Sequence, residues 1–223
     1  MAFKGIRKNP SAPQVDAAIL AALRDIPVAA LSDNMHRNIG SVGLTPYHRP
    51  GPATMAGTAV TLKSRGGDNL TLLRAFEFCR PGDVIVIDAD GDLSNAVIGG
   101  ILSFYAATIG TAGVVLDGAI RDLAEIRARD FPVYARGVNH RGPYKDGPGE
   151  INVPVSVGGM VVNPGDIVVG DQDGLMAFAP DEAEALITKA RAHLEAEANT
   201  MRAMKEGRWD RSFIDALEAR CAN

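Results

Sequence analysis

Cysteine is scarce in this chain, which has only Cys79 and Cys221 among its 223 residues. The two lie far apart and neither belongs to a Cys-x-x-Cys pair, so the sequence supports neither a disulfide framework nor a cysteine-based zinc site. Free thiols are typical of a reducing compartment. Because residues 1–8 also lack the apolar segment of a signal peptide, we expect a cytoplasmic protein.

Aromatic residues make up only 5% of the chain, and lysine and arginine form no dense run. The net charge at pH 7 is −4. Nucleic-acid-binding surfaces usually combine a basic face with aromatic side chains on which bases stack. The sequence therefore predicts no nucleic-acid partner.

Charge is absent from one long stretch, residues 93–116, which resembles a membrane span at first sight. Glycines interrupt it at Gly99, Gly100, Gly110 and Gly113. A helix that ends in a turn and leads into a buried strand explains such a stretch better than a bilayer helix does. We therefore expect no membrane interaction.

Apolar periodicity predicts helices and strands that alternate through the centre of the chain, with strands clustering later. Helices are expected at 13–26, 32–37, 69–78, 100–109, 121–129, 180–206 and 210–220, the second with Ser32-Asp33 as its N-cap. Strands are expected at 59–63, 84–87, 113–116, 132–136, 153–157, 167–169 and 175–179, and residues 137–149 are expected to form a surface loop. This order indicates mixed α/β layers.

A short motif occurs twice, as Pro81-Gly82-Asp83 and as Pro164-Gly165-Asp166, each time before an apolar run. Pro-Gly suits the centre of a type II turn, because glycine tolerates the positive φ that this turn needs. The repeat is too short to indicate a duplicated domain, so we interpret it as two similar turns that each lead into a strand.

Two other patterns do not predict a metal site. The run at 88–92 resembles a calcium loop, but its glycine comes two places early and the twelfth position is Gly99, where an EF-hand needs Glu. The four histidines show no metal-binding spacing such as HExxH.

The informative glycine pair is Gly99-Gly100, which opens a predicted helix and precedes Ile101 and Leu102. The first amides of a helix have no intrahelical partner and are suited to bind a carboxylate or a phosphate. Arg121 follows a predicted strand, where α/β proteins place ligands, and a guanidinium can bind a carboxylate in a bidentate way. Together these residues predict an anion site.

Asp122 and Glu125 follow Arg121 and are three positions apart, so a helix would place both on one face. Two carboxylates suit Mg²⁺ or Mn²⁺, which keep several water ligands. The alternative is a helical first turn that is rich in acids and stabilised by the helix dipole, with Arg121 in a surface salt bridge. Spacing alone favours this alternative, because a carboxylate pair is a weak signal.

Longer segments resemble the RraA-like family. They are 113–122, which ends in Leu116-Asp117-Gly118-Ala119-Ile120-Arg121-Asp122, and 129–137, and Gly100 completes the pattern G-x(20)-R-D-x(2)-E. The resemblance covers essentially the whole chain. The family contains 4-hydroxy-4-methyl-2-oxoglutarate/4-carboxy-4-hydroxy-2-oxoadipate aldolases, which also decarboxylate oxaloacetate, and non-enzymatic regulators of ribonuclease activity.

For the fold, this resemblance implies an αββα sandwich of the swivelling-domain type. We expect one domain over residues 1–223, with helical segments at about 13–40 and about 181–220. The resemblance also implies trimers or hexamers with active sites between subunits.

For the site, the resemblance implies a divalent metal, Mg²⁺ or Mn²⁺, with Asp122 as its ligand and Glu125 binding the metal or its waters. Arg121 would bind the pyruvyl carboxylate and stabilise the enolate. Backbone amides around Ile101 and Leu102, in the segment that starts at Gly99-Gly100, would hold the same carboxylate.

The predicted function is therefore a metal-dependent carbon–carbon lyase that releases pyruvate from 2-oxo dicarboxylic acids. The family's aldolases commonly carry Asp where this chain has Gly100, so we expect oxaloacetate decarboxylation to be retained and aldol cleavage to be weak. One alternative is a non-catalytic regulator that binds an RNA-processing enzyme. Another is a Schiff-base aldolase that uses Lys63 or Lys145, although both lysines are expected at the surface.

Overall fold

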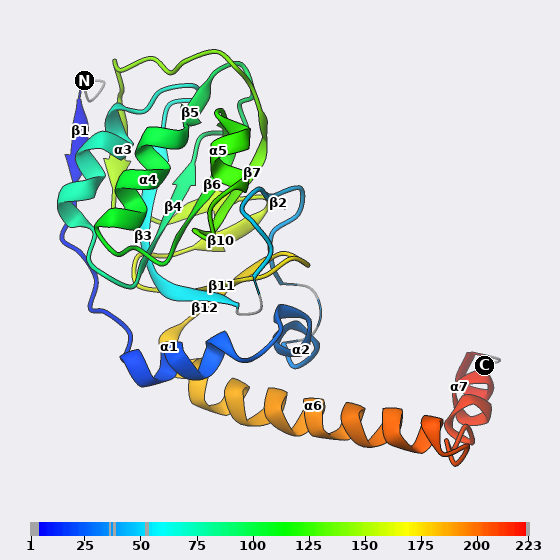
Figure 1. Ribbon diagram of the computed structural model, residues 1–223. Coiled ribbons are helices and arrows are strands. Elements are labelled where there is room, and N and C mark those ends of the chain that lie inside the picture. Colours follow the sequence, from blue (N-terminus) through cyan, green and yellow to red (C-terminus); the bar gives the residue numbers. More distant parts are fainter. Residues whose placement is uncertain (1–4, 36, 38, 52–53, 222–223) are drawn as a thin grey trace.

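A mixed β-sheet forms the centre of the structure (Figure 1). The computed structural model describes residues 5–35, 37, 39–51 and 54–221. The strands are β1 (Ile6–Lys8), β2 (Thr45–Pro46), β3 (Met55–Ser64), β4 (Asp83–Asp88), β5 (Ala96–Ile98), β6 (Gly113–Ile120), β7 (Val133–Val138), β8 (Gly149–Ile151), β9 (Val155–Val157), β10 (Met160–Val162), β11 (Ile167–Gly170) and β12 (Leu175–Phe178). The main path runs β1-β8-β3-β4-β6-β7-β2, while β11 pairs with β3 and β12, β5 pairs with β6, and β9 pairs with β10.

The parallel strands β3, β4, β6 and β7 are buried on both faces, and their alternating side chains enter two different cores. Ile85 and Ile87 of β4 belong to one core, whereas Val84 and Val86 belong to the other. This is the period-two alternation of a strand, and it explains why these strands are continuous apolar runs in the sequence.

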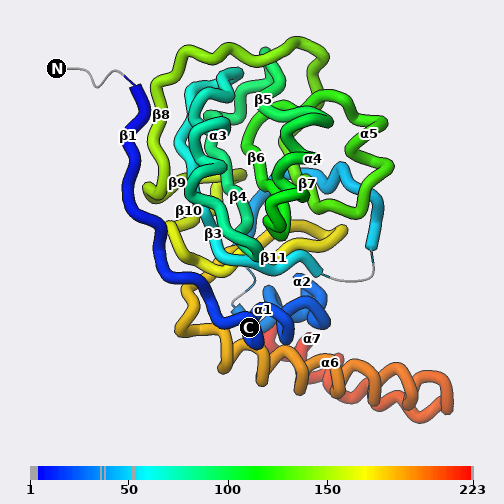
Figure 2. Tube along the Cα trace, turned by 60° about the vertical axis from the view of Figure 1, so that its left-hand side comes forward, coloured from blue at the N-terminus to red at the C-terminus, as the bar shows by residue number. Residues whose placement is uncertain are grey.

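Helices cover the strands on two sides. On one side lie α3 (Leu70–Ala75), α4 (Gly100–Thr108) and α5 (Leu123–Arg127), which pack on the first core through Leu72, Ala106 and Ile126. On the other side lie α1 (Ala17–Arg24), α2 (Val28–Asp33) and α6 (Ala183–Lys205), which pack on β11 and β12. Strands β9–β12 pack across the second core from β4, β6 and β7, with β11 and β12 joined to the main sheet through β3. This arrangement fits the expected αββα sandwich, and Figure 2 shows α1, α2 and α6 together on one side of it.

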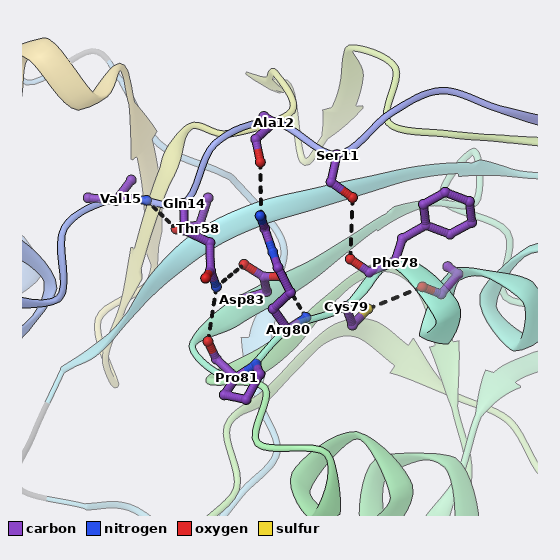
Figure 3. A network of polar contacts seen from close by, with 11 residues as sticks. Ser11, Ala12, Gln14, Val15, Thr58, Phe78, Cys79, Arg80, Pro81 and Asp83 are labelled. Carbon is purple, nitrogen blue, oxygen red and sulfur yellow. Dashed lines mark hydrogen bonds and ion pairs between the residues drawn. The ribbon is translucent and has the colours of Figure 1, made fainter.

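The segment before α1 is fastened to the start of β4 by the polar network in Figure 3. The Asp83 carboxylate is fully buried and accepts hydrogen bonds from the Gln14 side-chain amide at 3.0 Å and the Arg80 backbone N–H at 2.7 Å. The Arg80 guanidinium in turn donates to the carbonyl of Ala12 at 3.0 Å. A buried carboxylate that is paired in this way fixes the N-terminal segment against the sheet.

The two Pro-Gly motifs form the predicted turns. Gly82 has φ +87° and Gly165 has φ +91°, and each turn leads into a strand, β4 or β11. In both turns the aspartate N–H donates to the carbonyl three residues earlier, at 3.1 Å for Asp83 and 3.1 Å for Asp166. The interpretation as two similar turns is confirmed.

The C-terminal region leaves the body of the molecule. In Figure 1, α6 runs past α1 and α2, and α7 (Phe213–Cys221) lies at its far end. The stop predicted at Gly207 is confirmed, with φ +66° just after α6. Large apolar side chains stay exposed on this arm: Met201, Met204, Trp209, Phe213 and Leu217.

Two local predictions were wrong. Ser32-Asp33 does not begin a helix but ends α2, because Pro27 precedes the helix and Val28, Ala30 and Leu31 are already buried in it. The first helix begins at Ala17, where the Asp16 carboxylate caps it, and not at residue 13. In the uncharged stretch 93–116 the helix is α4, and among the described residues no helix is both long and apolar enough to cross a membrane.

Candidate functional site

The parallel pairing of β5 with β6 brings the two halves of the candidate site together. Ile98 pairs with Ile120 at the ends of these strands, and the Arg121 N–H donates to the Ile98 carbonyl at 3.0 Å. The next residues after each strand are Gly99-Gly100 and Arg121-Asp122, so they must lie side by side. Ligands of α/β proteins bind at such carboxyl ends of strands.

Asp122 lies outside the helix that the sequence predicted at 121–129. The helix is shorter, α5, and Asp122 precedes it in the left-handed conformation with φ 57° and ψ 42°. Aspartate tolerates this conformation better than most residues. The Asp122 carboxylate accepts a hydrogen bond from the Gly100 N–H at 3.0 Å, and its Oδ2 lies 3.7 Å from Arg121 Nε.

Glu125 is on the first turn of α5, so Asp122 and Glu125 do not share a helical face as predicted. They nevertheless converge, because both carboxylates lie against the glycine pair. A Cβ atom at Gly99 would collide with the Asp122 carboxylate, and a Cβ atom at Gly100 would collide with the Glu125 carboxylate. The two glycines thus allow these acidic side chains to approach the backbone closely.

The amides of α4 are only partly free. The Gly100 N–H is taken by Asp122, which corrects the expectation that the whole first turn is available. In the described part of the chain, the Ile101 and Leu102 amides donate no hydrogen bond. They therefore remain as donors for an anion at the positive end of the helix.

A cavity of about 170 Å³ opens beside these groups. The expected residues Gly99, Ile101, Leu102, Arg121 and Asp122 line it; Gly100 and Glu125 are not part of its lining. The other lining residues are Asn69, Leu73, Val97, Ile98, Pro143 and Lys145. The cavity has the size of a small organic acid rather than of a nucleotide or a peptide.

Asn69 lines this cavity, and the sequence did not reveal it as a site residue. Asn69 is 4% exposed, and its side-chain oxygen has no hydrogen-bond partner among the described residues. Buried polar atoms without a protein partner are rare and commonly bind a water. Lys145, which was expected at the surface and named only for the Schiff-base alternative, is exposed and also lines the cavity.

Asp68 explains how a surface loop reaches the cavity. Its fully buried carboxylate accepts hydrogen bonds from the N–H groups of Asp146 at 2.6 Å and Gly147 at 2.9 Å. The Asn69 N–H also donates to the Tyr144 carbonyl at 3.0 Å. These bonds hold the loop that carries Lys145 against the start of α3. No local pattern in the sequence could predict a contact between segments so far apart.

Asp117, another residue of the resembling segment, is placed away from the cavity lining. It is buried in β6 and pairs with Arg136, and it accepts a hydrogen bond from the Gly158 N–H at 2.7 Å. Burial alone would raise the pKa of the Asp117 carboxyl, but the hydrogen bonds from Arg136 and Gly158 hold that pKa below its ordinary value. Asp117 therefore links β6, β7 and the turn after β9.

The donor set at the glycine pair fits a hard divalent cation that keeps water ligands. Asp122 and Glu125 offer carboxylate oxygens against two adjacent residues, since the missing Cβ atom of Gly99 leaves room for Asp122 and that of Gly100 leaves room for Glu125. The described residues contain no cluster of three or more His, Cys, Asp or Glu that could enclose a metal. Two carboxylates with water completing the shell is a common arrangement for Mg²⁺ but not for zinc.

Comparison with known proteins gives the family of the chain. The sequence model of the RraA-like family, described as Aldolase/RraA, matches residues 28–177. The chain belongs to the RraA-like family. The match spans β3 through β11, and it includes every expected site residue.

Three relatives illustrate the range of this RraA-like family. A Halalkalibacterium halodurans protein named "Putative 4-hydroxy-4-methyl-2-oxoglutarate aldolase" is 39% identical over 180 residues, which are 80% of this chain and 84% of that protein. Streptomyces coelicolor RraAS2, described as an unusual member of the RNase ES inhibitor RraA family, has a TM-score of 0.75 at 26% identity and covers 84% of this chain and 98% of its own. The Thermus RNA-processing inhibitor RraA has a TM-score of 0.62 at 32% identity, and the match covers 69% of this chain and 92% of that protein.

Proposed function

We propose that this RraA-like protein is a divalent-metal-dependent carbon–carbon lyase that acts on 2-oxo dicarboxylic acids and releases pyruvate. The observation that carries the proposal is the meeting of Arg121, Asp122 and the free amides of Ile101 and Leu102 at one small cavity, with Glu125 beside them. The 39% identity to the protein named as an aldolase supports the same reaction class.

Asp122 and Glu125 would hold the metal, Mg²⁺ or Mn²⁺. When bound, such an ion supplies Lewis acidity toward the 2-keto oxygen of the substrate. Arg121, at the edge of the cavity, binds the pyruvyl carboxylate and places positive charge where the enolate develops. The Ile101 and Leu102 amides donate to the same carboxylate, which orients the bond that breaks.

The second carboxylate of the substrate would bind at the other wall of the cavity. Lys145, which lines the cavity, would bind it, and no ion-pair partner of its ammonium is found in the described chain. Asn69 also lines the cavity, and its unpaired side-chain oxygen could accept a hydrogen bond from a hydroxyl group or a water. Two cationic side chains, Arg121 and Lys145, around one small cavity suit a dianionic substrate better than a neutral one.

The Schiff-base alternative is not favoured for Lys63. Its ammonium lies 3.0 Å from Asp88 Oδ2 and also pairs with Asp90. Burial alone would lower the pKa of the Lys63 ammonium, but the hydrogen bonds to Asp90 and Asp88 outweigh it and raise that pKa above its ordinary value. A lysine that stays protonated is not a nucleophile. Lys145 keeps this alternative open, because it does line the cavity.

The regulator alternative has its own support, since one structural relative is described as an RNA-processing inhibitor and another as an unusual member of the RNase ES inhibitor RraA family. A regulator that acts by binding needs no cavity with paired acids and an arginine. The complete Arg121-Asp122-x-x-Glu125 set and its placement at a cavity therefore favour an enzyme.

We further propose that the chain forms trimers or hexamers with its sites near subunit contacts, as its family suggests. Ile101 is 78% exposed and Phe104 is 59% exposed, beside the cavity. Exposed apolar side chains of this size commonly lie in interfaces. Light scattering should show an oligomer at micromolar concentration, and a monomer alone would contradict this proposal.

The experiment for the lyase proposal is an oxaloacetate decarboxylation assay on the purified full chain. Pyruvate is measured with and without EDTA, and after Mg²⁺ or Mn²⁺ is added back. The proposal expects turnover that EDTA abolishes and either metal restores. Borohydride is added with pyruvate in parallel, and covalent trapping on Lys145 would support the Schiff-base route. Absence of turnover with every metal would favour the regulator.

A further inference from the structure

Arg129 connects three parts of the candidate site. It follows α5, and its guanidinium donates to the Gly100 carbonyl at 2.8 Å and to the Ser103 hydroxyl at 3.3 Å. Its other terminal nitrogen lies 3.4 Å from the Glu125 carboxylate. The same group lies over the Phe104 ring, 5.2 Å from its centre.

We propose that Arg129 is a positioning residue that holds the Glu125 carboxylate against Gly100 and fixes the first turn of α4. The inference rests on the proposed function, because it concerns the acid expected to bind the metal or its waters. Arg129 does not line the cavity, so it acts through Glu125 and the α4 backbone rather than on the substrate.

Arg129 acts by orienting the Glu125 side chain rather than by the stability of its ion pair. The Glu125 side chain is 61% exposed, and an ion pair so open to water adds little stability by itself. A planar guanidinium, however, can donate to three acceptors at once, and the ring of Phe104 restricts its orientation. Without it, Glu125 would be free to rotate into solvent away from Gly100. A lysine ammonium could not reach the three acceptors together.

Arg127, the last residue of α5, provides a matched control. It is exposed, and its side chain makes no hydrogen bond or ion pair within the described residues. Arg127→Gln therefore removes the same charge, two residues away from Arg129, without removing a contact to the site.

The test measures Mn²⁺ affinity by electron paramagnetic resonance without substrate, and kcat and KM for oxaloacetate with the metal. Arg129→Gln should weaken Mn²⁺ binding by roughly 10-fold and lower kcat by a similar factor, the usual effect of removing a residue that orients a metal ligand. Arg129→Lys should rescue little. Arg127→Gln should match the wild type, and circular dichroism should show all variants folded.

A double-mutant comparison separates positioning from general stability. If Arg129 acts through Glu125, Arg129→Gln should cost no further Mn²⁺ affinity in a Glu125→Gln background. Additive losses, or wild-type Mn²⁺ affinity in Arg129→Gln, would overturn the inference. If Arg129→Gln does not fold, Arg129→Lys serves in the same comparison.

The same data distinguish this inference from the lyase proposal. A wild-type protein that binds Mn²⁺ but does not decarboxylate oxaloacetate would contradict the lyase proposal, and the Mn²⁺ titrations alone would then decide the role of Arg129. A wild-type protein that neither binds Mn²⁺ nor shows turnover would overturn both.

Discussion

The carboxylate of Glu125 occupies the space that a side chain at Gly100 would need. An acidic side chain at position 100 would begin where the Glu125 carboxylate lies. We therefore propose that Glu125 of α5, three residues after Asp122, takes the place of the acid that this chain lacks at position 100. With Glu125 in that place, glycine at position 100 is no longer a reason to expect weak aldol cleavage.

Gly100→Asp should therefore lower activity rather than improve it, because two carboxylates would compete for one space. We expect kcat/KM for oxaloacetate to fall by about 10-fold, in the range for a displaced metal-shell group. The double variant Gly100→Asp/Glu125→Ala should regain part of the loss. Both reactions, decarboxylation and cleavage of a 4-hydroxy-2-oxo acid, are measured in each protein. Improved aldol cleavage in Gly100→Asp alone would instead show that Glu125 does not replace the acid.

Lys145→Ala should raise KM for oxaloacetate by about 10-fold or more, since a charged hydrogen bond contributes roughly 1.5–3 kcal/mol. A 2-oxo acid without a second carboxylate should be affected much less. Lys189→Ala, which removes an exposed lysine of α6, is the control. Equal effects on both substrates would place Lys145 outside the distal carboxylate site.

Arg121→Ala should lower kcat/KM by about 100-fold, the usual cost of removing a donor to a developing oxyanion. Arg121→Lys should have a kcat/KM less than about 10-fold above that of Arg121→Ala, because lysine keeps the charge but loses the planar fork. Arg141→Ala is the control, because the side chain of this loop arginine makes no hydrogen bond or ion pair among the described residues. Near wild-type kinetics in Arg121→Lys would indicate a simple role of charge.

Asp117→Asn should destabilise the fold by about 2 kcal/mol at neutral pH, because the variant loses charged hydrogen bonds with Arg136. The pKa of Asp117 is lowered in the folded state, so its contribution is present above the unfolded pKa of about 3.9 and is lost as the pH falls through the folded pKa. Urea unfolding should thus give a gap between wild type and variant that shrinks below pH 4. Asp173→Asn, at an exposed turn, is the control, and a gap that is constant with pH would contradict the assignment.

The cysteines illustrate how far composition alone can reach. Both are free, as the sequence predicted. Burial raises the pKa of the Cys79 thiol to about 12, so this thiol is a packing residue. This prediction needed only the small number of cysteines, their separation along the chain and the absence of a Cys-x-x-Cys pair.

Periodicity predicted most of the fold for a physical reason. Buried parallel strands such as β4 and β6 are continuous apolar runs, and α4 follows a glycine pair, so each is visible locally. The short strands β1, β2, β5, β8 and β10 were missed because two or three residues carry no periodic signal. Missing β5 also hid the reason why Gly99 and Arg121 meet.

Only part of the site could be predicted from the sequence, because its residues are not all close together along the chain. Arg121, Asp122 and Glu125 are close in sequence, and the family pattern adds Gly100. Asn69 and Lys145 reach the cavity through long-range hydrogen bonds at Asp68, which no local motif reveals. The left-handed turn at Asp122 was equally hidden, since helical spacing alone placed that residue inside a helix.

Oxaloacetate decarboxylation by Asp122 variants is the most direct test of the proposal that this protein is a metal-dependent lyase. Asp122→Asn is used beside Asp122→Ala, because asparagine tolerates the left-handed conformation and keeps a hydrogen bond to the Gly100 N–H. We predict that circular dichroism will show both variants folded, and that both will lose turnover at any Mg²⁺ or Mn²⁺ concentration. Full metal-dependent activity in a folded Asp122→Ala protein would contradict it.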